Sequence, residues 1–369
     1  MSERNLSAIV LAAGAGTRMK SSRPKPLHLL AGRSMLQYVL DSLAGCSVER
    51  VVVVVGHGAE RVTKKLQSQE PDLHLTFVEQ PQQNGTGDAA SVGLTGLPDD
   101  DGPESDLHDV LVLPGDMPLL QPATVAALVA AHRAADAGCT VLTAKVPDPG
   151  SYGRIVRGKD DQVVRIVERA DATAEELEID EINTAVYCFR RSVLAPALRR
   201  ITPENAQGEY YLTDVVAVLR DAGYRIAAVE VEDPADAEGI NDRLQLANAE
   251  AELRRRTNER WLQAGVTLVD PTSTYIDSTV QLASDVTLFP GTILQGATVI
   301  GAGAEIGPHT RLVDCVVGAG ATVEQSNARD AEIGAEARVG PFAALAPGAS
   351  VPDGTITGPF YAAAGPEDS

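Results

Sequence analysis

The chain of 369 residues has little positive charge, few cysteines and no long apolar run. Its net charge of −20 and its pI near 4.7 argue against a nucleic-acid partner, which needs a basic face, and against an anionic membrane surface. The cysteines are scattered, with neither a CxxC pair nor a histidine at metal-ligand spacing, so we expect reduced core residues. Without a signal peptide or a membrane-spanning apolar stretch, the sequence predicts a cytoplasmic protein.

The most informative feature that is present is a glycine-rich turn after a short apolar run. Residues 8–12 are typical of a buried parallel strand, and the glycines in residues 14–16 free backbone N–H groups to face an anionic ligand. Arg18 and Lys25 add positive charge, so the segment suits a nucleoside triphosphate. The dinucleotide-binding fingerprint is excluded because it needs glycine where Met19 stands, and the P-loop because it needs a Gly-Lys-Ser/Thr closure.

Residues 1–243 alternate short apolar runs with helical patterns. This alternation predicts an α/β, Rossmann-like domain with a mostly parallel sheet covered by helices, in which ligands bind at the carboxyl ends of the strands. The glycine turn and Asp116 both follow such strands, so we expect them to share a cleft. The expected strands are 8–12, 51–55, 75–78, 110–113, 140–144 and 226–231, and the expected helices include 35–43, 59–67 and 122–135.

The pattern changes after residue 243. A charged, alanine-rich stretch over 244–265 predicts a linker helix, and Trp261 is expected to anchor it to one of the domains rather than to stack on a ligand. Over 266–357 a period of six residues is typical of a short left-handed parallel β-helix, with about four coils of about eighteen residues, and disfavours a β-sandwich. Residues 325–329 interrupt this period, and 358–369 form a loop-like tail. The aliphatic residues in phase are Leu288, Leu294, Ile300, Ile306, Leu312, Ile333, Val339, Leu345 and Val351.

Several further motifs occur in a fixed order and carry a resemblance. Residues 11–25 look like the signature of the sugar nucleotidylyltransferases. From about Ser7 to about Gly348 the chain resembles the bacterial bifunctional N-acetylglucosamine-1-phosphate uridylyltransferase/glucosamine-1-phosphate acetyltransferase family. The segments that carry this resemblance are Gln80, Gln83, Gly85-Thr86-Gly87, Gly115-Asp116, Tyr152-Gly153-Arg154, Ile166-Val167-Glu168, Glu181-Ile182-Asn183-Thr184, the block 205–214 and Gly239-Ile240-Asn241.

The resemblance implies transfer of a uridylyl group from UTP to N-acetylglucosamine 1-phosphate, with release of pyrophosphate and with Mg²⁺ as cofactor. A sugar phosphate is largely ionised near neutral pH, because the second pKa of a phosphomonoester is about 6, so no general base is needed. Arg18 would hold the departing pyrophosphate with its planar fork, and Lys25 would stabilise the α-phosphoryl group. Asp116 and Asn241 would hold the metal.

The same resemblance assigns the nucleotide and sugar contacts. A glutamine side chain can match the edge of uracil, which thymine shares, so dTTP stays an alternative to UTP. Three positions depart from the family pattern: Asp88 stands where histidine is common, Pro114 where tyrosine is common and Ala185 where glycine is frequent. The nucleotide residues implied are Leu11, Ala12, Ala13, Gly14, Gln80, Gly85 and Thr86, and the sugar residues are Gly153, Glu168, Asn183, Tyr211 and Thr213.

The second domain is expected to lack the acetyltransferase activity of that family. The family's acyl-transfer residues lie on later coils, which this chain does not reach, and Ala346 stands where an arginine is expected. We therefore expect a truncated, single-activity enzyme whose β-helix makes a homo-oligomer, a trimer. Two alternatives stay open: a nucleotidylyltransferase for another sugar 1-phosphate in a specialised pathway, and a non-catalytic nucleotide-sugar-binding paralogue. The joint presence of both cations and both metal ligands disfavours the second.

Overall fold

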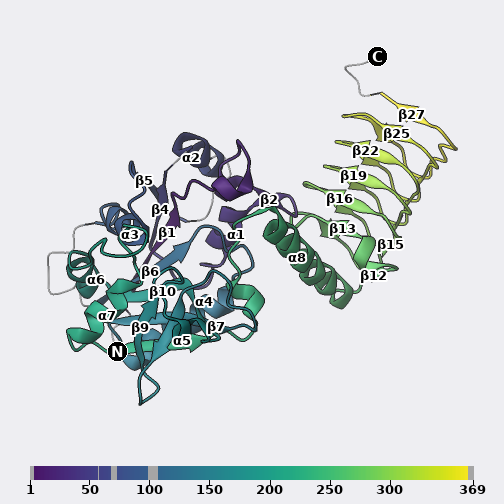
Figure 1. Ribbon diagram of the computed structural model, residues 1–369. Helices are drawn as coiled ribbons and strands as arrows, with labels where there is room; N and C mark the ends of the chain where they lie inside the picture. The colour runs from purple at the N-terminus through teal and green to yellow at the C-terminus, as the bar shows by residue number, and fades with distance from the viewer. Residues whose placement is uncertain (1–3, 57, 68–72, 99–106, 365–369) are drawn as a thin grey trace. The chain divides into compact units, whose positions relative to one another are not determined.

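The apolar runs of the N-terminal part form one mixed sheet (Figure 1). The computed structural model describes residues 4–56, 58–67, 73–98 and 107–364. Within these ranges the sheet has nine strands: seven follow the order β11-β7-β10-β6-β1-β4-β5, while β8 pairs with β10 and β9 pairs with β8. The strands are β1 (Asn5–Ala12), β4 (Arg50–Val55), β5 (Leu75–Glu79), β6 (His108–Pro114), β7 (Cys139–Lys145), β8 (Arg154–Arg157), β9 (Val163–Val167), β10 (Glu181–Arg190) and β11 (Ile226–Glu230).

The sheet is parallel along its main path except at β10, which runs antiparallel between β6 and β7. The α/β class and the six predicted strands are confirmed. Strand β10 was not predicted. Its pairing with β7 shifts register between Asn183 and Tyr187, so its apolar side chains do not follow one simple period.

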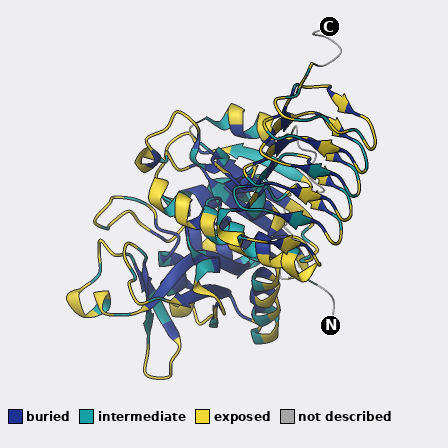
Figure 2. Cartoon of the chain, turned by 90° about the vertical axis from the view of Figure 1, so that its right-hand side faces the viewer, coloured by how far each residue is buried: buried dark blue, intermediate teal, exposed yellow. Residues whose placement is uncertain are grey.

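Helices cover both faces of the sheet, whose central strands are almost wholly buried (Figure 2). One face packs against α1 (Met35–Asp41), α2 (Ala59–Gln67) and α4 (Pro122–Ala135), and the other against α3 (Thr86–Leu94), α6 (Arg191–Leu198) and α7 (Asp214–Asp221). Two short strands, β2 (Leu29–Leu30) and β3 (Arg33–Ser34), precede α1, and α5 (Ala174–Leu177) precedes β10. No helix in the described part of the chain could span a lipid bilayer, because each is too short or too polar.

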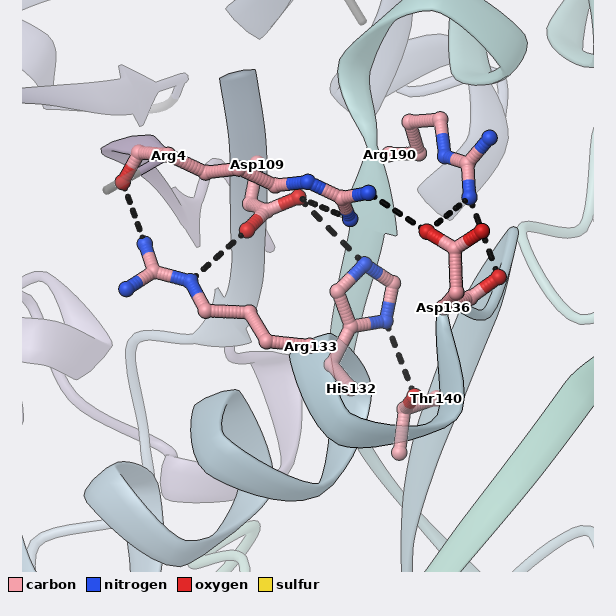
Figure 3. Close-up of polar contacts among 7 residues, drawn as sticks. All are labelled: Arg4, Asp109, His132, Arg133, Asp136, Thr140 and Arg190. Carbon is pink, nitrogen blue, oxygen red and sulfur yellow. Dashed lines mark hydrogen bonds and ion pairs between the residues drawn. The ribbon is translucent and has the colours of Figure 1, made fainter. Parts of the chain in front are cut away.

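A charged cluster closes the end of the sheet at which β1 and β6 begin (Figure 3). Asp109, at the start of β6, is fully buried and accepts a hydrogen bond from Nε of Arg133 at 3.0 Å, while His132 Nε2 lies 3.5 Å away. Burial opposes ionisation, but His132, Arg133 and Arg4 hold the pKa of Asp109 below its ordinary value. Arg4 also bonds Asp136 at 2.5 Å. This end of the sheet is therefore fastened by ion pairs, away from the carboxyl ends of the strands.

The C-terminal part forms three short parallel sheets, as a β-helix does. By their mutual contacts, the described residues 29–33 and 246–364 belong to this unit, and the other described residues belong to the first. The structure describes five strands on two of the three faces and six on the third. The stack therefore has more coils than the four expected, because it already begins at β12. The faces are β12 (Thr267–Leu268), β15 (Thr287–Leu288), β18 (Glu305–Ile306), β21 (Thr322–Val323) and β24 (Arg338–Val339); β13 (Tyr275–Ile276), β16 (Ile293–Gln295), β19 (Arg311–Val313), β22 (Asn327–Arg329), β25 (Ala344–Leu345) and β27 (Ala362–Ala363); and β14 (Gln281–Leu282), β17 (Val299–Ile300), β20 (Val316–Val317), β23 (Glu332–Ile333) and β26 (Ser350–Val351).

One aliphatic side chain per strand fills the interior of the β-helix. The nine aliphatic residues predicted to be in phase are all buried. The six-residue period is interrupted near residues 325–329 because some inward side chains are only five residues apart. This spacing occurs between Leu312 and Val317, and again before and after Ala328. Three glycines let successive coils stack closely, since a Cβ on Gly301, Gly318 or Gly334 would lie 2.4–2.6 Å from a backbone nitrogen of the next coil.

The segment at residues 244–265, expected to be a linker helix, is helical up to Gln263, where α8 (Arg243–Gln263) ends. Trp261 of this helix packs against the core of the β-helix. The segment expected to be a loop-like tail contains β27, which pairs with β25 and so adds a strand to one face. Residues 365–369 of that segment lie outside the described residues.

Candidate active site

A cavity of about 340 Å³ opens at the carboxyl ends of β1, β5 and β6, the edge predicted for a ligand. Residues from β10, from the start of α3 and from the loop before α7 complete its wall. The lining residues are Leu11, Ala12, Ala13, Gly14, Lys25, Pro26, Gln80, Gln83, Gly85, Thr86, Ala89, Pro114, Gly115, Asp116, Glu168, Asn183, Ala185, Tyr187, Glu209, Leu212 and Thr213.

In the turn after β1, backbone conformation and lack of space both require a glycine at Gly16. This residue has φ +60°, a conformation that side chains disfavour, and a Cβ there would lie 2.7 Å from Cβ of Lys25. At Gly14, by contrast, a Cβ would meet nothing within 4 Å. Gly16 therefore lets the lysine stem pack against the turn, while Gly14 leaves room on the cavity wall.

Four of the predicted functional side chains meet at one point of this edge. Lys25 Nζ forms an ion pair with Oδ2 of Asp116 and donates a hydrogen bond to Oδ1 of Asn241 at 2.9 Å. Arg18 Nη2 donates to the same Asn241 oxygen at 2.9 Å. The ammonium and the carboxylate are mostly buried, with side-chain exposures of 13% and 23%. The cluster thus places two cations beside two side-chain oxygens that could also bind a metal.

The backbone brings these residues together although they are far apart in sequence. Asp116 follows β6, and the N–H of Gly115 donates to the carbonyl of Leu11 at 2.8 Å, which ties the ends of β6 and β1. The N–H of Ile240 donates to the carbonyl of Asp116 at 2.9 Å. Asn241 consequently reaches the same edge of the sheet.

The oxygen donors of this cluster fit a divalent cation with few protein ligands. Oδ2 of Asp116 and Oδ1 of Asn241 both bind Lys25 Nζ, so both lie within bonding reach of one position. Among the described residues no group of three or more His, Cys, Asp and Glu side chains could hold a metal. A carboxylate and an amide oxygen suit Mg²⁺, which keeps water or substrate phosphate as its other ligands.

The loop before α7 is joined to the start of α3 by one backbone hydrogen bond and by one bond to a side-chain hydroxyl. The N–H of Gly87 donates to the carbonyl of Tyr210 at 2.7 Å, and that of Leu212 donates to Oγ1 of Thr86 at 3.0 Å. Gly85, with φ +110°, must lack a Cβ because the atom would lie 2.5 Å from the Tyr210 oxygen. The Gly-Thr-Gly motif therefore fixes one wall of the cavity against the other.

Asn205 shapes that loop from within. Its Nδ2 donates to the carbonyl of Glu209 at 2.6 Å, and its Oδ1 accepts from the N–H groups of Gln207 and Glu209 at 3.2 Å. Asparagine side chains commonly stabilise turns in this way. The family-specific block 205–214 is thus explained by the turn that it builds.

Three of the residues predicted to contact sugar, Glu168, Asn183 and Thr213, line another wall of the cavity. Thr213 Oγ1 donates to Oε1 of Glu168 at 3.2 Å. The N–H of Ala185 donates to Oδ1 of Asn183 at 3.1 Å, which leaves the amide nitrogen of Asn183 as its donor to a ligand. Ala185 itself has φ +62° and lines the cavity, so its methyl group occupies space that a glycine would leave open.

Two titratable groups on this wall are shifted toward their neutral forms. Burial raises the pKa of Glu168, and the nearby carboxylates Asp214 and Asp171 add to the shift against the hydrogen bond from Thr213. Burial, with Asp171 and Glu168, raises the pKa of Tyr211 to about 12. The described residues of this wall therefore offer carboxyl, hydroxyl and amide groups for hydrogen bonds rather than cations.

Most of the predicted site residues line the cavity. Four do not. Arg18 and Asn241 belong to the charged cluster beside the cavity. The carbonyl of Gly153 accepts a hydrogen bond of 2.9 Å from the N–H of Asn183, and Tyr211 is buried without lining the cavity. Lining residues left out of the predicted set are Pro26, Gln83, Ala89, Pro114, Gly115, Ala185, Tyr187, Glu209 and Leu212.

A sequence signal existed for some of the omitted residues. Gln83 is one of the residues that carry the family resemblance, so it was a candidate for the predicted site. Its Nε2 donates to the carbonyl of Ala13 at 2.6 Å. Tyr187 lies on β10 beyond the register shift, where no sequence period places it.

The fold and this cavity define a nucleotidyltransferase. Residues 8–214 match the family model described as the MobA-like NTP transferase domain, and this span contains the glycine turn, Lys25, Asp116 and all of the lining residues named above. The match covers more than half of the chain. The chain is therefore a nucleotidyltransferase of this α/β class.

The chain belongs to the family of the bifunctional protein GlmU. It is 44% identical to that protein of Corynebacterium aurimucosum over 361 residues, which cover 97% of this chain and 73% of the relative. It is 47% identical to that of Mycolicibacterium vanbaalenii over 349 residues, covering 94% of this chain and 70% of the relative. The bifunctional protein GlmU of Heliobacterium modesticaldum is 44% identical, with 96% and 75% covered.

Proposed function

We propose that this nucleotidyltransferase transfers the uridylyl group of UTP to N-acetylglucosamine 1-phosphate, forming UDP-N-acetylglucosamine for nucleotide-sugar and cell-wall biosynthesis. The observation that carries this proposal is the meeting of Lys25, Arg18, Asp116 and Asn241 beside a cavity lined by Gln80 and Glu168. The first four suit two polyanions and a metal. The last two offer hydrogen bonds for a base and a sugar.

The chemistry requires position and charge rather than a base. An oxygen of the sugar phosphate forms a bond to the α-phosphorus of UTP, and the bond from that phosphorus to pyrophosphate breaks. The attacking phosphate is already ionised near neutral pH, so no proton need be removed. Lys25 would neutralise charge on the α-phosphoryl group, and Arg18 would bind the departing pyrophosphate.

The metal ligands complete this arrangement. Asp116 and Asn241 would hold Mg²⁺, which supplies charge neutralisation to the phosphates when bound. Asp116 also holds Lys25 in place through their ion pair. Both residues thus contribute to binding the triphosphate in one geometry.

The test is pyrophosphate release from UTP, dTTP and ATP, each with several sugar 1-phosphates and with or without Mg²⁺. We expect the highest rate with UTP, N-acetylglucosamine 1-phosphate and Mg²⁺. Lys25→Ala and Asp116→Ala should each lower kcat/KM by about 10²–10³, the usual loss on removing one electrostatic contact to a transition state. Lys64→Ala, which removes an exposed cation of α2, is the control and should keep the wild-type rate.

The other outcomes distinguish the alternatives. Faster turnover of another sugar 1-phosphate or of dTTP would favour the enzyme of a specialised pathway. Binding of UTP without pyrophosphate release would favour the non-catalytic paralogue. Full activity of either alanine variant would contradict the role assigned to that residue.

We propose further that the described residues lack acetyl transfer and that the β-helix makes a trimer. Ala346 offers only a half-buried methyl group where the resembling motif has a cation. Release of free thiol from acetyl-coenzyme A in the presence of glucosamine 1-phosphate would contradict the first proposal. Sedimentation as a monomer at micromolar concentration would contradict the second.

A further inference from the structure

The side-chain amide of Gln80 is held in a single orientation. Its Nε2 donates to Oδ2 of Asp88 at 2.7 Å and to the carbonyl of Gly85 at 3.3 Å. A carboxylate and a backbone carbonyl only accept hydrogen bonds. Rotation of the amide by 180° would therefore bring its oxygen against two other oxygens.

The surroundings fix Gln80 in both backbone and side chain. Its N–H donates to the carbonyl of Val55 at 2.8 Å, which places it directly after β5. Its side chain is buried and lines the cavity. Because Nε2 faces Asp88 and Gly85, Oε1 is the group left to bind a ligand. Gln80 is consequently a hydrogen-bond acceptor at this position.

We propose that Asp88 sets the base specificity of the nucleotide site by holding Gln80 as an acceptor. The proposal rests on the proposed function, in which Gln80 faces the base. Uracil and thymine carry a donor at N3, whereas N3 of cytosine is an acceptor. An acceptor held rigidly at Gln80 can therefore bind the N3 donor of uracil or thymine, whereas it is repelled by the N3 acceptor of cytosine. Asp88 is thus a positioning residue, because it acts through Gln80.

A purely structural role for Asp88 makes a different prediction. Asp88 lies in the first turn of α3, where a negative charge also stabilises a helix. Loss of that contribution would weaken the fold and affect all nucleotides alike. Only the positioning role links this side chain to the ratio between two pyrimidine bases.

The decisive variant is Asp88→Asn, because an amide keeps the shape but can donate as well as accept. Gln80 can then turn and offer its NH₂ group to cytosine. We expect the ratio of kcat/KM for UTP over CTP to fall about tenfold, the loss that corresponds to one good hydrogen bond between neutral groups. The ratio for UTP over dTTP should stay unchanged, because both bases carry the N3 donor.

Two controls isolate the mechanism. Glu175→Gln removes an exposed acid from the first turn of α5, a helix that contributes no residue to the cavity, so it tests the loss of a helix charge away from Gln80. It should leave the UTP:CTP ratio at the wild-type value. In a Gln80→Ala background, Asp88→Asn should no longer change that ratio. A change that persists there, or an unchanged ratio in the single variant, would overturn the proposal.

Calorimetric binding of UTP, CTP and dTTP without sugar phosphate separates this inference from the proposed function. If no sugar 1-phosphate yields pyrophosphate but Asp88→Asn still lowers the preference for UTP over CTP, the proposed function fails and the inference stands. If the enzyme forms UDP-N-acetylglucosamine and the preference survives in the variant, the inference alone fails. Should Asp88→Asn not fold, Asp88→Ser supplies the same neutral donor and acceptor for both measurements.

Discussion

At the scale of residues, Glu168 shows how a side chain that is placed to bind a ligand can lower the stability of the fold. Glu168 makes no ion pair among the described residues, and its carboxylate accepts a hydrogen bond from the hydroxyl of Thr213. Its pKa is raised, first by burial and then by neighbouring carboxylates. The ionised form is therefore less favourable in the folded chain than in the unfolded one.

The sign of the pH effect follows from this shift. Below the ordinary pKa of the carboxyl group both states are protonated, and Glu168 has no cost. As the pH rises through that value toward the raised pKa of the folded state, the unfolded chain loses its proton first, so stability falls. We expect Glu168→Gln to unfold at higher urea concentration than wild type at pH 8, with a smaller difference at pH 5.

The same variant should lose function, because an amide accepts fewer hydrogen bonds from sugar hydroxyls. The KM for the sugar phosphate should rise about tenfold. Glu178→Gln, at an exposed position after α5, serves as the control and should change neither property. A Glu168→Gln variant that is less stable than wild type at pH 8 would contradict the assigned shift.

The residue scale also shows what sequence could predict at the site. The cluster around Lys25 was expected because motifs at three separate places each supply one part, and parallel topology joins their ends at one edge. The orientation of the Gln80 amide could not be predicted. It depends on Asp88 and the bend at Gly85, whose angles no motif encodes.

At the scale of elements, the β-helix shows how strictly two neighbouring positions can differ. On β20, Val316 points outward and is 50% exposed, whereas Val317 points inward and is 2% exposed. Val317 stacks in register between Ile300 and Ile333 on neighbouring coils. The same residue type therefore has opposite roles one position apart.

This pair gives a matched test of the stack. Val317→Ala should lower the free energy of unfolding by about 2 kcal/mol, from the lost methyl burial and the cavity left behind. Val316→Ala should change it by less than about 0.5 kcal/mol, as surface changes do. Urea denaturation followed by circular dichroism measures both. An equal loss for Val316→Ala would mean that the outer face of β20 is covered in solution.

The elements also mark the limits of sequence prediction. Strands with continuous apolar runs, such as β1 and β4, were predicted because burial on both faces leaves no polar alternation. Strand β10 was missed, since its register shift and its antiparallel direction depend on its neighbours. In the β-helix, three of the inward residues were missed where corners shorten the spacing to five: Val317, Val323 and Ala328.

At the scale of the whole molecule, net charge governs association. Each copy carries a formal charge of −20, so copies of the proposed trimer repel one another. Added salt shortens the Debye length from about 30 Å at 0.01 M to about 10 Å at 0.1 M and weakens this repulsion. We expect the trimer dissociation constant, measured by analytical ultracentrifugation, to fall as sodium chloride rises from 0.01 to 0.3 M.

A neutral osmolyte gives the control for that titration, because it leaves the Debye length unchanged. Dissociation of the oligomer by salt would show that attraction between opposite charges, rather than apolar contact, holds the copies together. That result would contradict the expectation drawn from the net charge.

The glycines between coils have a consequence for how this unit can change in evolution. Gly301, Gly318 and Gly334 each sit where any larger residue would act as a wedge against the backbone above. A residue inserted into or deleted from a strand would turn aliphatic side chains toward solvent, whereas the corners absorb single-residue changes, since these glycines stay stacked although they are 17 and then 16 residues apart. Removal or duplication of one complete turn of the stack keeps every column aligned. The length of such a solenoid is therefore quantised, and natural variants should differ by whole coils.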